Sequence, residues 1–177
     1  MITHQQTENL ATLSEIGAVS DFKIKASSKA FNILSSSLYA NKIRAIVREL
    51  STNAYDSHVA AKKASEPFHV HLPSALEPWF SIRDYGVGLN DDEVNKIYTT
   101  YFESTKTDSN DFVGELGLGS KSPFSYTENF SVTAIKDGMK RIYTAFVNDI
   151  GVPAIAKMSE ISTEEQSGVE IKFAVSN

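Results

Sequence analysis

The sequence predicts an α+β two-layer sandwich, in which helices cover one face of a mixed, mostly antiparallel sheet. A long amphipathic segment in the first half and a run of alternating strands in the last third are the two main observations. The third is size, because 177 residues suit one domain with a sizeable core. The proportions of 41% apolar and 22% charged residues are typical of a globular protein.

The elements of the first half follow from periodicity and capping residues. Residues 1–20 are polar and weakly patterned, which indicates an arm that is mobile or exchanged in a dimer. Residues 21–27 alternate as a short strand, and Ser28 is a candidate cap of a short helix. The strongest helix is predicted over 40–64. Its apolar positions recur at helical spacing and are Ile43, Ile46, Val47, Leu50 and Ala54.

The middle of the chain alternates between strands, a helix and a loop. Strands are predicted over 67–72 and 79–84, separated by a Pro-containing turn. Asn90 is the expected cap of the next helix, because acidic residues follow it directly. Residues 99–113 are polar with little periodicity and are expected to form a long loop.

The last third predicts four strands. Two alternating runs within 129–149 are joined by Asp137-Gly138, which is a strong hairpin signal. Further strands are expected over 152–158 and 168–175.

Several classes of protein are excluded or disfavoured. A net charge of −5 argues against direct nucleic-acid binding through phosphate neutralisation. The absence of cysteine excludes disulfides and thiolate metal sites and suits a reducing cytoplasm. The first 21 residues lack the basic region and apolar core expected of a secretory signal, and no apolar run reaches the roughly 20 residues expected of a membrane span. His69 and His71 share one strand face but lack a third metal ligand.

The first motif lies on the long helix. Glu49, Asn53 and Asp56 are spaced by four and three residues, so they fall within an arc of roughly 60° beside the apolar edge. Such a stripe fits either a cleft wall or ordinary solvated surface, and the helix alone does not decide between them.

The second motif is Asp84-Tyr85-Gly86-Val87-Gly88, directly after a predicted strand. Two spaced glycines let the backbone approach a flat ligand, while the carboxylate accepts a hydrogen bond from an N–H or NH2 group. A plain turn is the alternative interpretation.

The third motif is rich in glycine and reads GELGLGSKSPF over 114–124. Glycines near a helix start can present backbone N–H groups to phosphate, and Lys121 supplies charge. A P-loop is rejected, because Ser120 is inserted before the lysine and no buried strand precedes the motif. A Rossmann fingerprint is rejected too, because Ser122 stands where its third glycine belongs.

The three motifs together, in this order, resemble those of the GHKL superfamily of gyrase, heat-shock chaperones, histidine kinases and MutL. Its motifs E-x-x-x-N-x-x-D, D-x-G-x-G and G-x-x-G-x-G match positions 49–56, 84–88 and 114–119, and the resemblance runs from about residue 20 to the end. More narrowly, the stretches NKIRAIVREL, YFESTK, SNDF and GLGSKSPFSYT resemble the N-terminal region of phage rapid-lysis rIIA proteins.

The resemblance implies the Bergerat fold and a site for ATP and Mg²⁺. Asp84 is expected to bind the adenine amino group, with a water that Ser57 or a neighbour helps to hold. Asn53 is expected to place its amide oxygen on Mg²⁺, and Asp56 to line the adenine-side wall. Glu49 is the expected catalytic residue, which orients or deprotonates the water that attacks the γ-phosphate.

The resemblance also implies a mobile ATP lid over about 90–120, within a domain that spans 21–177. Gly86 and Gly88 are expected beside the base, and Ser104, Thr105 and Lys106 resemble a nucleotide-contacting segment of MutL-like proteins. The segment expected to bind the triphosphate contains Gly114, Gly117, Leu118, Gly119, Ser120 and Lys121.

One position departs from the superfamily pattern. Many members have a Gly-Thr pair in a late strand, whose threonine contacts the adenine site, whereas this chain has Gly168-Val169. Thr133 or Ser167 could supply the missing hydroxyl; otherwise adenine recognition depends more on Asp84.

Three functions fit the resemblance. The preferred one is a slow ATPase that acts as a nucleotide-driven switch in an rIIA-like protein, because Glu49 is intact. The second is a nucleotide-binding module with negligible hydrolysis that acts on a host protein. A histidine-kinase-type phosphotransferase is disfavoured, because that branch usually has a basic residue where Asp56 stands. ATP, ADP, an ATP-dependent homodimer and a host protein are the expected partners in the host cytoplasm, and membrane association follows only by analogy.

Overall fold

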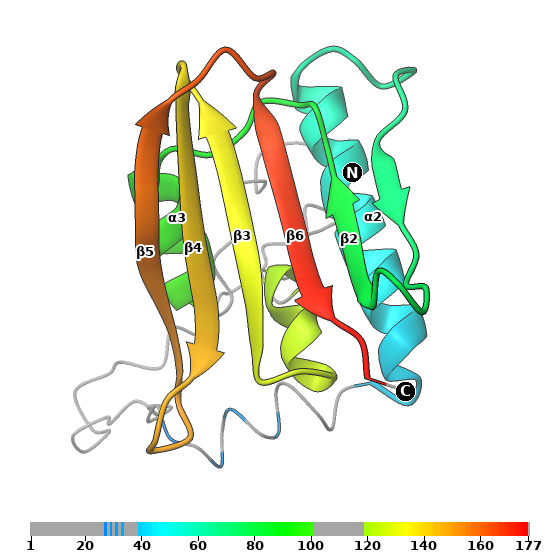
Figure 1. Cartoon of the computed structure of the whole chain (residues 1–177), viewed down its shortest axis with the longest axis vertical. Coiled ribbons are helices and arrows are strands. Elements are labelled where there is room, and N and C mark those ends of the chain that lie inside the picture. Colours follow the sequence, from blue (N-terminus) through cyan, green and yellow to red (C-terminus); the bar gives the residue numbers. More distant parts are fainter. Residues whose placement is uncertain are drawn as a thin grey trace, which may run out of the picture.

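The computed structural model describes residues 39–100 and 119–176, together with positions 27, 29, 31 and 33. One layer is a six-stranded sheet, and helices α2 (Lys42–Ala60) and α3 (Asp91–Thr99) lie behind it in Figure 1. The short 3-10 helix η3 (Gly119–Ser125) packs against α2 on the same side of the sheet. The predicted α+β two-layer sandwich is therefore confirmed.

The sheet is built entirely from antiparallel pairs among the described strands. Its order is β1-β2-β6-β3-β4-β5, so the last strand lies in the middle, between β2 and β3. The strands are β1 (His69–His71), β2 (Trp79–Arg83), β3 (Asn129–Lys136), β4 (Met139–Val147), β5 (Pro153–Ser162) and β6 (Gly168–Ala174). Asp137 and Gly138 both have positive φ, as the predicted hairpin turn requires.

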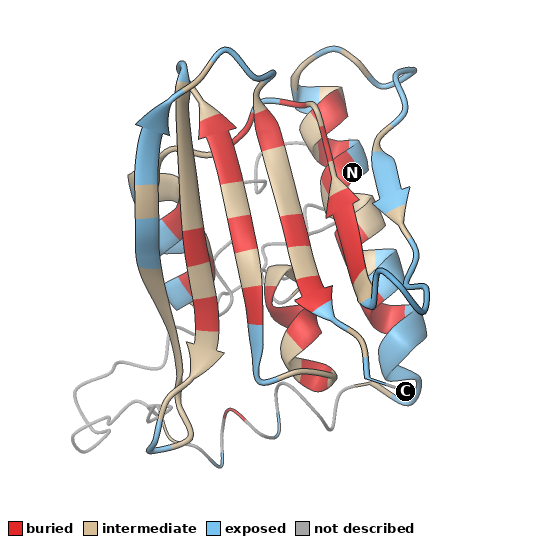
Figure 2. Cartoon of the chain, in the orientation of Figure 1, coloured by how far each residue is buried: buried red, intermediate tan, exposed pale blue. Residues whose placement is uncertain are grey.

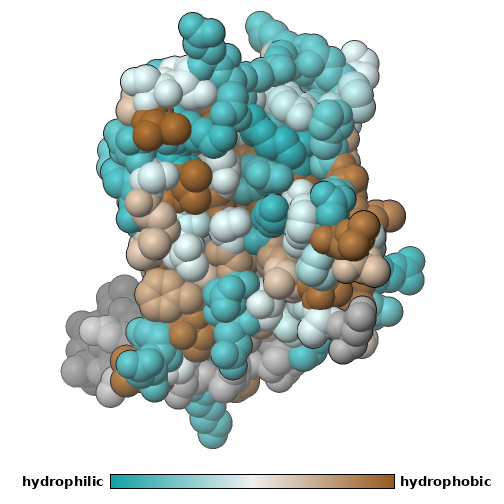
Figure 3. Space-filling view, viewed as in Figure 1, coloured by the Kyte–Doolittle hydropathy of each residue, from teal (hydrophilic) through white to brown (hydrophobic). Residues whose placement is uncertain are grey.

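The core lies between the sheet and its helices. Figure 2 shows buried and partly exposed residues alternating along β3 and β6, because successive side chains of a strand point to opposite faces. The buried cluster contains Ile46, Leu50, Ala54, Phe80, Ile82, Val94, Tyr98, Phe130, Val132, Ala134, Tyr143, Ala145, Ile171 and Phe173. The helix-free face, seen in Figure 3, is a mosaic of polar and apolar residues.

The inward half of α2 differs from the sequence-based prediction. Ile43 and Val47, expected on its apolar face, are 64% and 40% exposed. The buried residues of α2 are Ala45, Ile46, Leu50, Ala54, Asp56 and His58. At 100° per residue, Glu49 and Asn53 fall inside this buried half rather than beside it. The prediction is confirmed for Ile46, Leu50 and Ala54 and was wrong for Ile43 and Val47. Because α2 packs against both η3 and the sheet, these contacts set which side faces inward.

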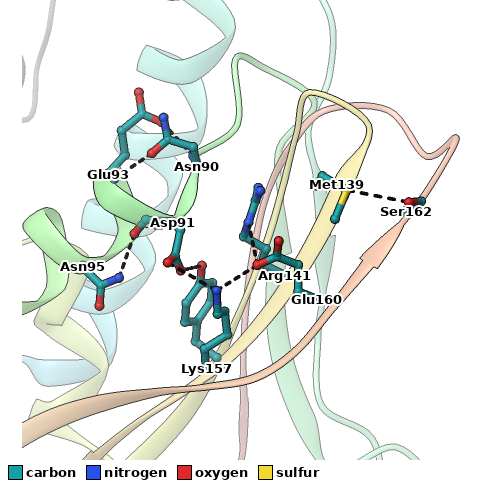
Figure 4. Close-up of polar contacts among 10 residues, drawn as sticks. Asn90, Asp91, Glu93, Asn95, Met139, Arg141, Lys157, Glu160 and Ser162 are labelled. Atoms are coloured by element: carbon teal, nitrogen blue, oxygen red, sulfur yellow. Dashed lines mark hydrogen bonds and ion pairs between the residues drawn. The ribbon is translucent and has the colours of Figure 1, made fainter.

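Helix α3 is anchored at its start by polar contacts with the sheet. The Asn90 side chain accepts a hydrogen bond from the Glu93 N–H, and the Glu93 carboxylate accepts one from the Asn90 N–H, so the predicted cap is confirmed. Tyr143 donates to Asp91 at 2.6 Å. Figure 4 shows Lys157 of β5 between Asp91 and Glu160, at 3.3 and 2.8 Å. These contacts fix α3, which occupies part of the predicted lid range, against β4 and β5.

Several predicted segments lie outside the described residues: the arm at 1–20, residues 21–26 of the predicted strand, the Ser28 cap and residues 101–113 of the loop. In the described part of the chain, none of the helices combines the length and the apolar character needed to cross a bilayer.

Lys121 links η3 to the last turn of α3. Its side chain is buried, and Nζ donates to the Ile97 carbonyl, one of the helix-end carbonyls that lack a partner within the helix. Burial lowers the pKa of Lys121 to about 8. The folded protein therefore favours the neutral amine more than the unfolded chain does.

We predict that Gly88→Ala destabilises the protein far more than Gly138→Ala. Both glycines have φ near +70°, at +65° and +70°, so alanine meets the same backbone strain at each, roughly 1 kcal/mol. A Cβ at Gly88 would also overlap the Ile135 carbonyl oxygen, whereas at Gly138 its nearest neighbour is the Thr163 carbonyl at 3.9 Å. Urea titrations should give a loss of at least about 3 kcal/mol at Gly88. Equal losses would contradict the close approach of this turn to β3.

Lys121 should make stability rise with pH in the alkaline range. Because its folded pKa is lowered to about 8, the folded state binds fewer protons than the unfolded state between about pH 8 and 10. The resulting gain in unfolding free energy is complete above the pKa of Lys121 in the unfolded chain. It is lost as pH falls through the pKa of Lys121 in the folded protein. The unfolding free energy of the parent relative to Lys121→Met, which lacks the titrating amine, should therefore rise between these values. A constant difference would contradict the burial of the charge.

Candidate functional site

Helix α2 carries the first sequence motif and contacts the second motif and Gly119, the last residue of the third. Ser57, near its C-terminal end, contacts the Asp84–Gly88 turn, and Glu49, two turns earlier, contacts the first residue of η3. Eight residues of helix separate the two contacts by about 12 Å along the axis. Asn53 lies between them on the same half of the helix. The first motif, the Asp84–Gly88 turn and Gly119 therefore line one elongated strip.

Asp84 is held rigidly at one end of this strip. Its Oδ1 accepts hydrogen bonds from the Ser57 hydroxyl and the Gly86 N–H, both at 2.9 Å. Its Oδ2 accepts one from the Val169 N–H at 3.1 Å. The residue is 5% exposed, and burial raises the pKa of the Asp84 carboxyl, although the three hydrogen bonds oppose that shift. Asp84 is thus a fixed, desolvated acceptor.

The turn after Asp84 lies directly on the backbone of α2. A Cβ at Gly86 would overlap the Ser57 hydroxyl and carbonyl, so no larger residue fits without displacing the turn. Gly88 has φ of +65° and approaches β3 equally closely. The sequence predicted that these glycines allow close backbone approach, and their observed neighbours are α2 and β3.

His58 is a buried contact of the same turn that the sequence did not reveal. Its ring is 1% exposed, and Nε2 accepts a hydrogen bond from the Tyr85 N–H at 2.8 Å. Nδ1 lies 3.1 Å from the Glu66 carbonyl oxygen. From the sequence, His58 was only one of four scattered histidines. Its place directly after Ser57 was the one available signal.

Glu49 stands at the other end of the strip. Its side chain is 19% exposed and forms an ion pair with Arg48. A Cβ at Gly119 would lie 2.6 Å from Glu49 Oε2, so η3 begins against this carboxylate. Burial, and then the Glu49 charge, raise the pKa of the nearby Tyr39 hydroxyl. The carboxylate is therefore partly desolvated but still reached by solvent.

The remaining predicted residues divide into three groups. Asp56 is 1% exposed, whereas Asn53 is partly exposed and its amide has no hydrogen bond to another described residue. Ser120 and Lys121 lie in η3 beside α2, and the Lys121 ammonium is turned toward α3. Ser104, Thr105, Lys106, Gly114, Gly117 and Leu118 lie outside the described residues, so their roles stay predictions.

Thr133 was one candidate for the hydroxyl that Val169 does not supply. It alternates with the buried Val132 and Ala134, so its hydroxyl lies on the helix-free face and cannot take that role.

His69 and His71 were considered as metal ligands, and both have other partners. Tyr85 contacts His69 through its hydroxyl, and His71 lies between Trp79 and Glu77. No group of three metal-binding side chains occurs among the described residues.

The fold can be compared with solved structures. The chain is similar to the ATPase region of Saccharomyces cerevisiae topoisomerase II, at 17% identity and a TM-score of 0.56, over 73% of this chain and 37% of that one. It is equally similar to that region bound to ICRF-187 (dexrazoxane), at 17% identity and a TM-score of 0.57, over 74% and 37%. The chain thus spans well under half of the length of these structures.

The sequence comparisons gave no further relatives, because no family model and no curated protein matches the chain. At 17% identity the likeness to the topoisomerase II structures shows the fold alone. The fold inferred from the three ordered motifs is therefore confirmed, and the chain has the GHKL, or Bergerat, fold of the topoisomerase II ATPase region.

Proposed function

We propose that this chain binds ATP with Mg²⁺, hydrolyses it slowly and acts as a nucleotide-driven switch. The observation that carries the proposal is the arrangement on α2. A buried acceptor, Asp84, binds Ser57 at one end of the strip. A partly desolvated carboxylate, Glu49, lies at the other end, about 12 Å from Ser57 along the helix axis. These ends suit the base and the terminal phosphate of one extended nucleotide.

The adenine end depends on Asp84. Its carboxylate accepts hydrogen bonds only, so it selects a ligand group that donates, such as the adenine amino group. Val169 offers no hydroxyl here, but its backbone N–H holds Asp84 Oδ2. The side chain of Asp84 therefore carries base recognition in the proposal, with Ser57 positioned to hold a bridging water.

The phosphate end depends on Glu49 and Asn53. Glu49 would take the proton of the water that attacks the γ-phosphate, which yields ADP and phosphate. The half-buried Asn53 amide has no partner among the described residues, and Mg²⁺ prefers such an oxygen together with phosphate oxygens and water. The oxygen ligands that Asn53, the phosphates and water would supply therefore fit Mg²⁺. Mg²⁺ would supply charge neutralisation between the phosphates.

A nucleotide-binding module that hydrolyses very little ATP and acts on a host protein is the second candidate. It keeps the same adenine site, and it differs only in whether Glu49 performs catalysis. The narrower resemblance to rIIA proteins supports placing either activity in phage infection, with ATP-dependent pairing of two copies as the expected output. Asp56, buried on α2, stands where a basic residue is usual in the kinase branch.

Calorimetry with ATP and Mg²⁺ should detect binding to the parent protein. Asp84→Asn should weaken that binding by about tenfold or more, because an amide NH2 would face the N–H groups that now donate to the carboxylate. Thermal unfolding of the same variant is the control for folding. If the parent protein shows no heat of binding with ATP and Mg²⁺, the proposal is wrong.

Glu49→Ala should abolish steady-state ATP turnover and leave ATP affinity within about threefold. Loss of a general base typically lowers the rate by about 10²–10⁴-fold. Arg48→Ala is the matched control, because it removes the neighbouring charge and keeps the carboxylate. If Glu49→Ala hydrolyses ATP as fast as the parent, Glu49 is not the base, and the non-hydrolysing module becomes the better description.

A further inference from the structure

The imidazole of His58 forms a buried bridge between two segments that follow α2 in the chain. Nε2 accepts a hydrogen bond from the Tyr85 N–H at 2.8 Å, and Nδ1 lies 3.1 Å from the Glu66 carbonyl. A carbonyl only accepts, so Nδ1 carries the proton and Nε2 carries the lone pair. The Phe68 ring packs edge-on at 6.3 Å between centroids. Both ring nitrogens are therefore used, in one defined tautomer.

His58 holds Tyr85, the residue between Asp84 and Gly86. Ser57 binds the Asp84 carboxylate, and His58, the next residue of α2, binds the following N–H. Two adjacent side chains of one helix thus dock two adjacent residues of the turn. Because Gly86 also rests on the Ser57 backbone, the turn has a single position relative to the helix.

Tyr85 is tethered at its other groups as well. Lys63 Nζ and Gln166 Nε2 donate to its carbonyl at 3.3 and 3.4 Å. Its hydroxyl lies 2.9 Å from His69 Nδ1, and the Arg83 guanidinium lies 4.9 Å from its ring centroid. These contacts hold the side chain and the carbonyl. The Tyr85 N–H, which is the group of this residue closest to Asp84, has His58 as its partner.

We propose that His58 is a positioning residue for base recognition, which holds the Asp84 carboxylate ready for a nucleotide through the Tyr85 N–H. The inference rests on the proposed function and extends it to a residue outside the three motifs. An apolar residue could fill the same space against Phe68, but it would leave the Tyr85 N–H buried without a partner. The turn would then sample other positions, and apparent affinity falls with the fraction of molecules in the competent one.

Two conservative substitutions separate the two hydrogen bonds of the ring. His58→Asn places an amide near Nδ1, so it retains the donor to Glu66 and loses the acceptor for Tyr85. His58→Gln places an amide oxygen within reach of the Nε2 position, so it retains the acceptor and loses the donor. Each variant gives up one buried hydrogen bond, and their losses of stability should be similar.

The test is calorimetry of ATP with Mg²⁺ on both variants, alongside thermal unfolding. His58→Asn should bind about tenfold more weakly than the parent, and His58→Gln within about threefold. Hydrogen exchange supplies a second measurement on the parent protein, in which the Tyr85 amide should be protected without nucleotide.

Each other outcome has a definite meaning. Equal affinities in both variants, whether near the parent value or reduced together, would overturn the positioning role, as would an unprotected Tyr85 amide in the parent. If the parent protein itself binds no ATP, the proposed function fails, and this inference fails with it. Binding by the parent together with unchanged variants overturns the inference alone.

Discussion

The contact between the last turns of α2 and the turn at Asp84–Gly86 is the constraint on which the rest of the structure depends. Ser57 supplies a hydroxyl to Asp84, and Gly86 allows the two backbones to touch. The contact fixes the end of β2 against the helix layer, and so it sets the distance between sheet and helix at this edge. It also sets the point from which the chain enters α3, at the Asn90 cap.

The central position of β6 completes this arrangement from the far end of the chain. Gly168 has φ of +143°, and a Cβ there would overlap the Asp84 backbone carbonyl, so the strand begins directly beside the backbone of Asp84. The Val169 N–H then satisfies Asp84 Oδ2, and the Asp84 N–H donates to the Val169 carbonyl at 2.9 Å. A buried carboxylate is costly unless it is hydrogen-bonded, and here the backbone of a distant strand meets that requirement.

Elements with strong local signals were predicted well. The Asn90 cap, the Asp137-Gly138 hairpin and the alternating strands depend on neighbouring residues, and the structure contains all of them. The inward face of α2 was predicted less well. Ile43 and Val47 are exposed because burial depends on what packs against a helix, which hydropathy along one segment does not report. Which face of β3 carries Thr133 likewise depends on the register of the sheet.

The sequence by itself determined most of the elements, because helix caps, turn residues and periodicity are local properties of the chain. The order of the three motifs predicted the fold as well, but only through their resemblance to a known superfamily. Only the tertiary structure decided that α2 contacts both the Asp84–Gly88 turn and the start of η3, that the Val169 N–H joins the Ser57 hydroxyl on the Asp84 carboxylate, and that His58 holds Tyr85. These contacts join residues 27 or more positions apart. Only folding of the whole chain brings such groups within hydrogen-bonding distance, so no local pattern in the sequence predicts these contacts.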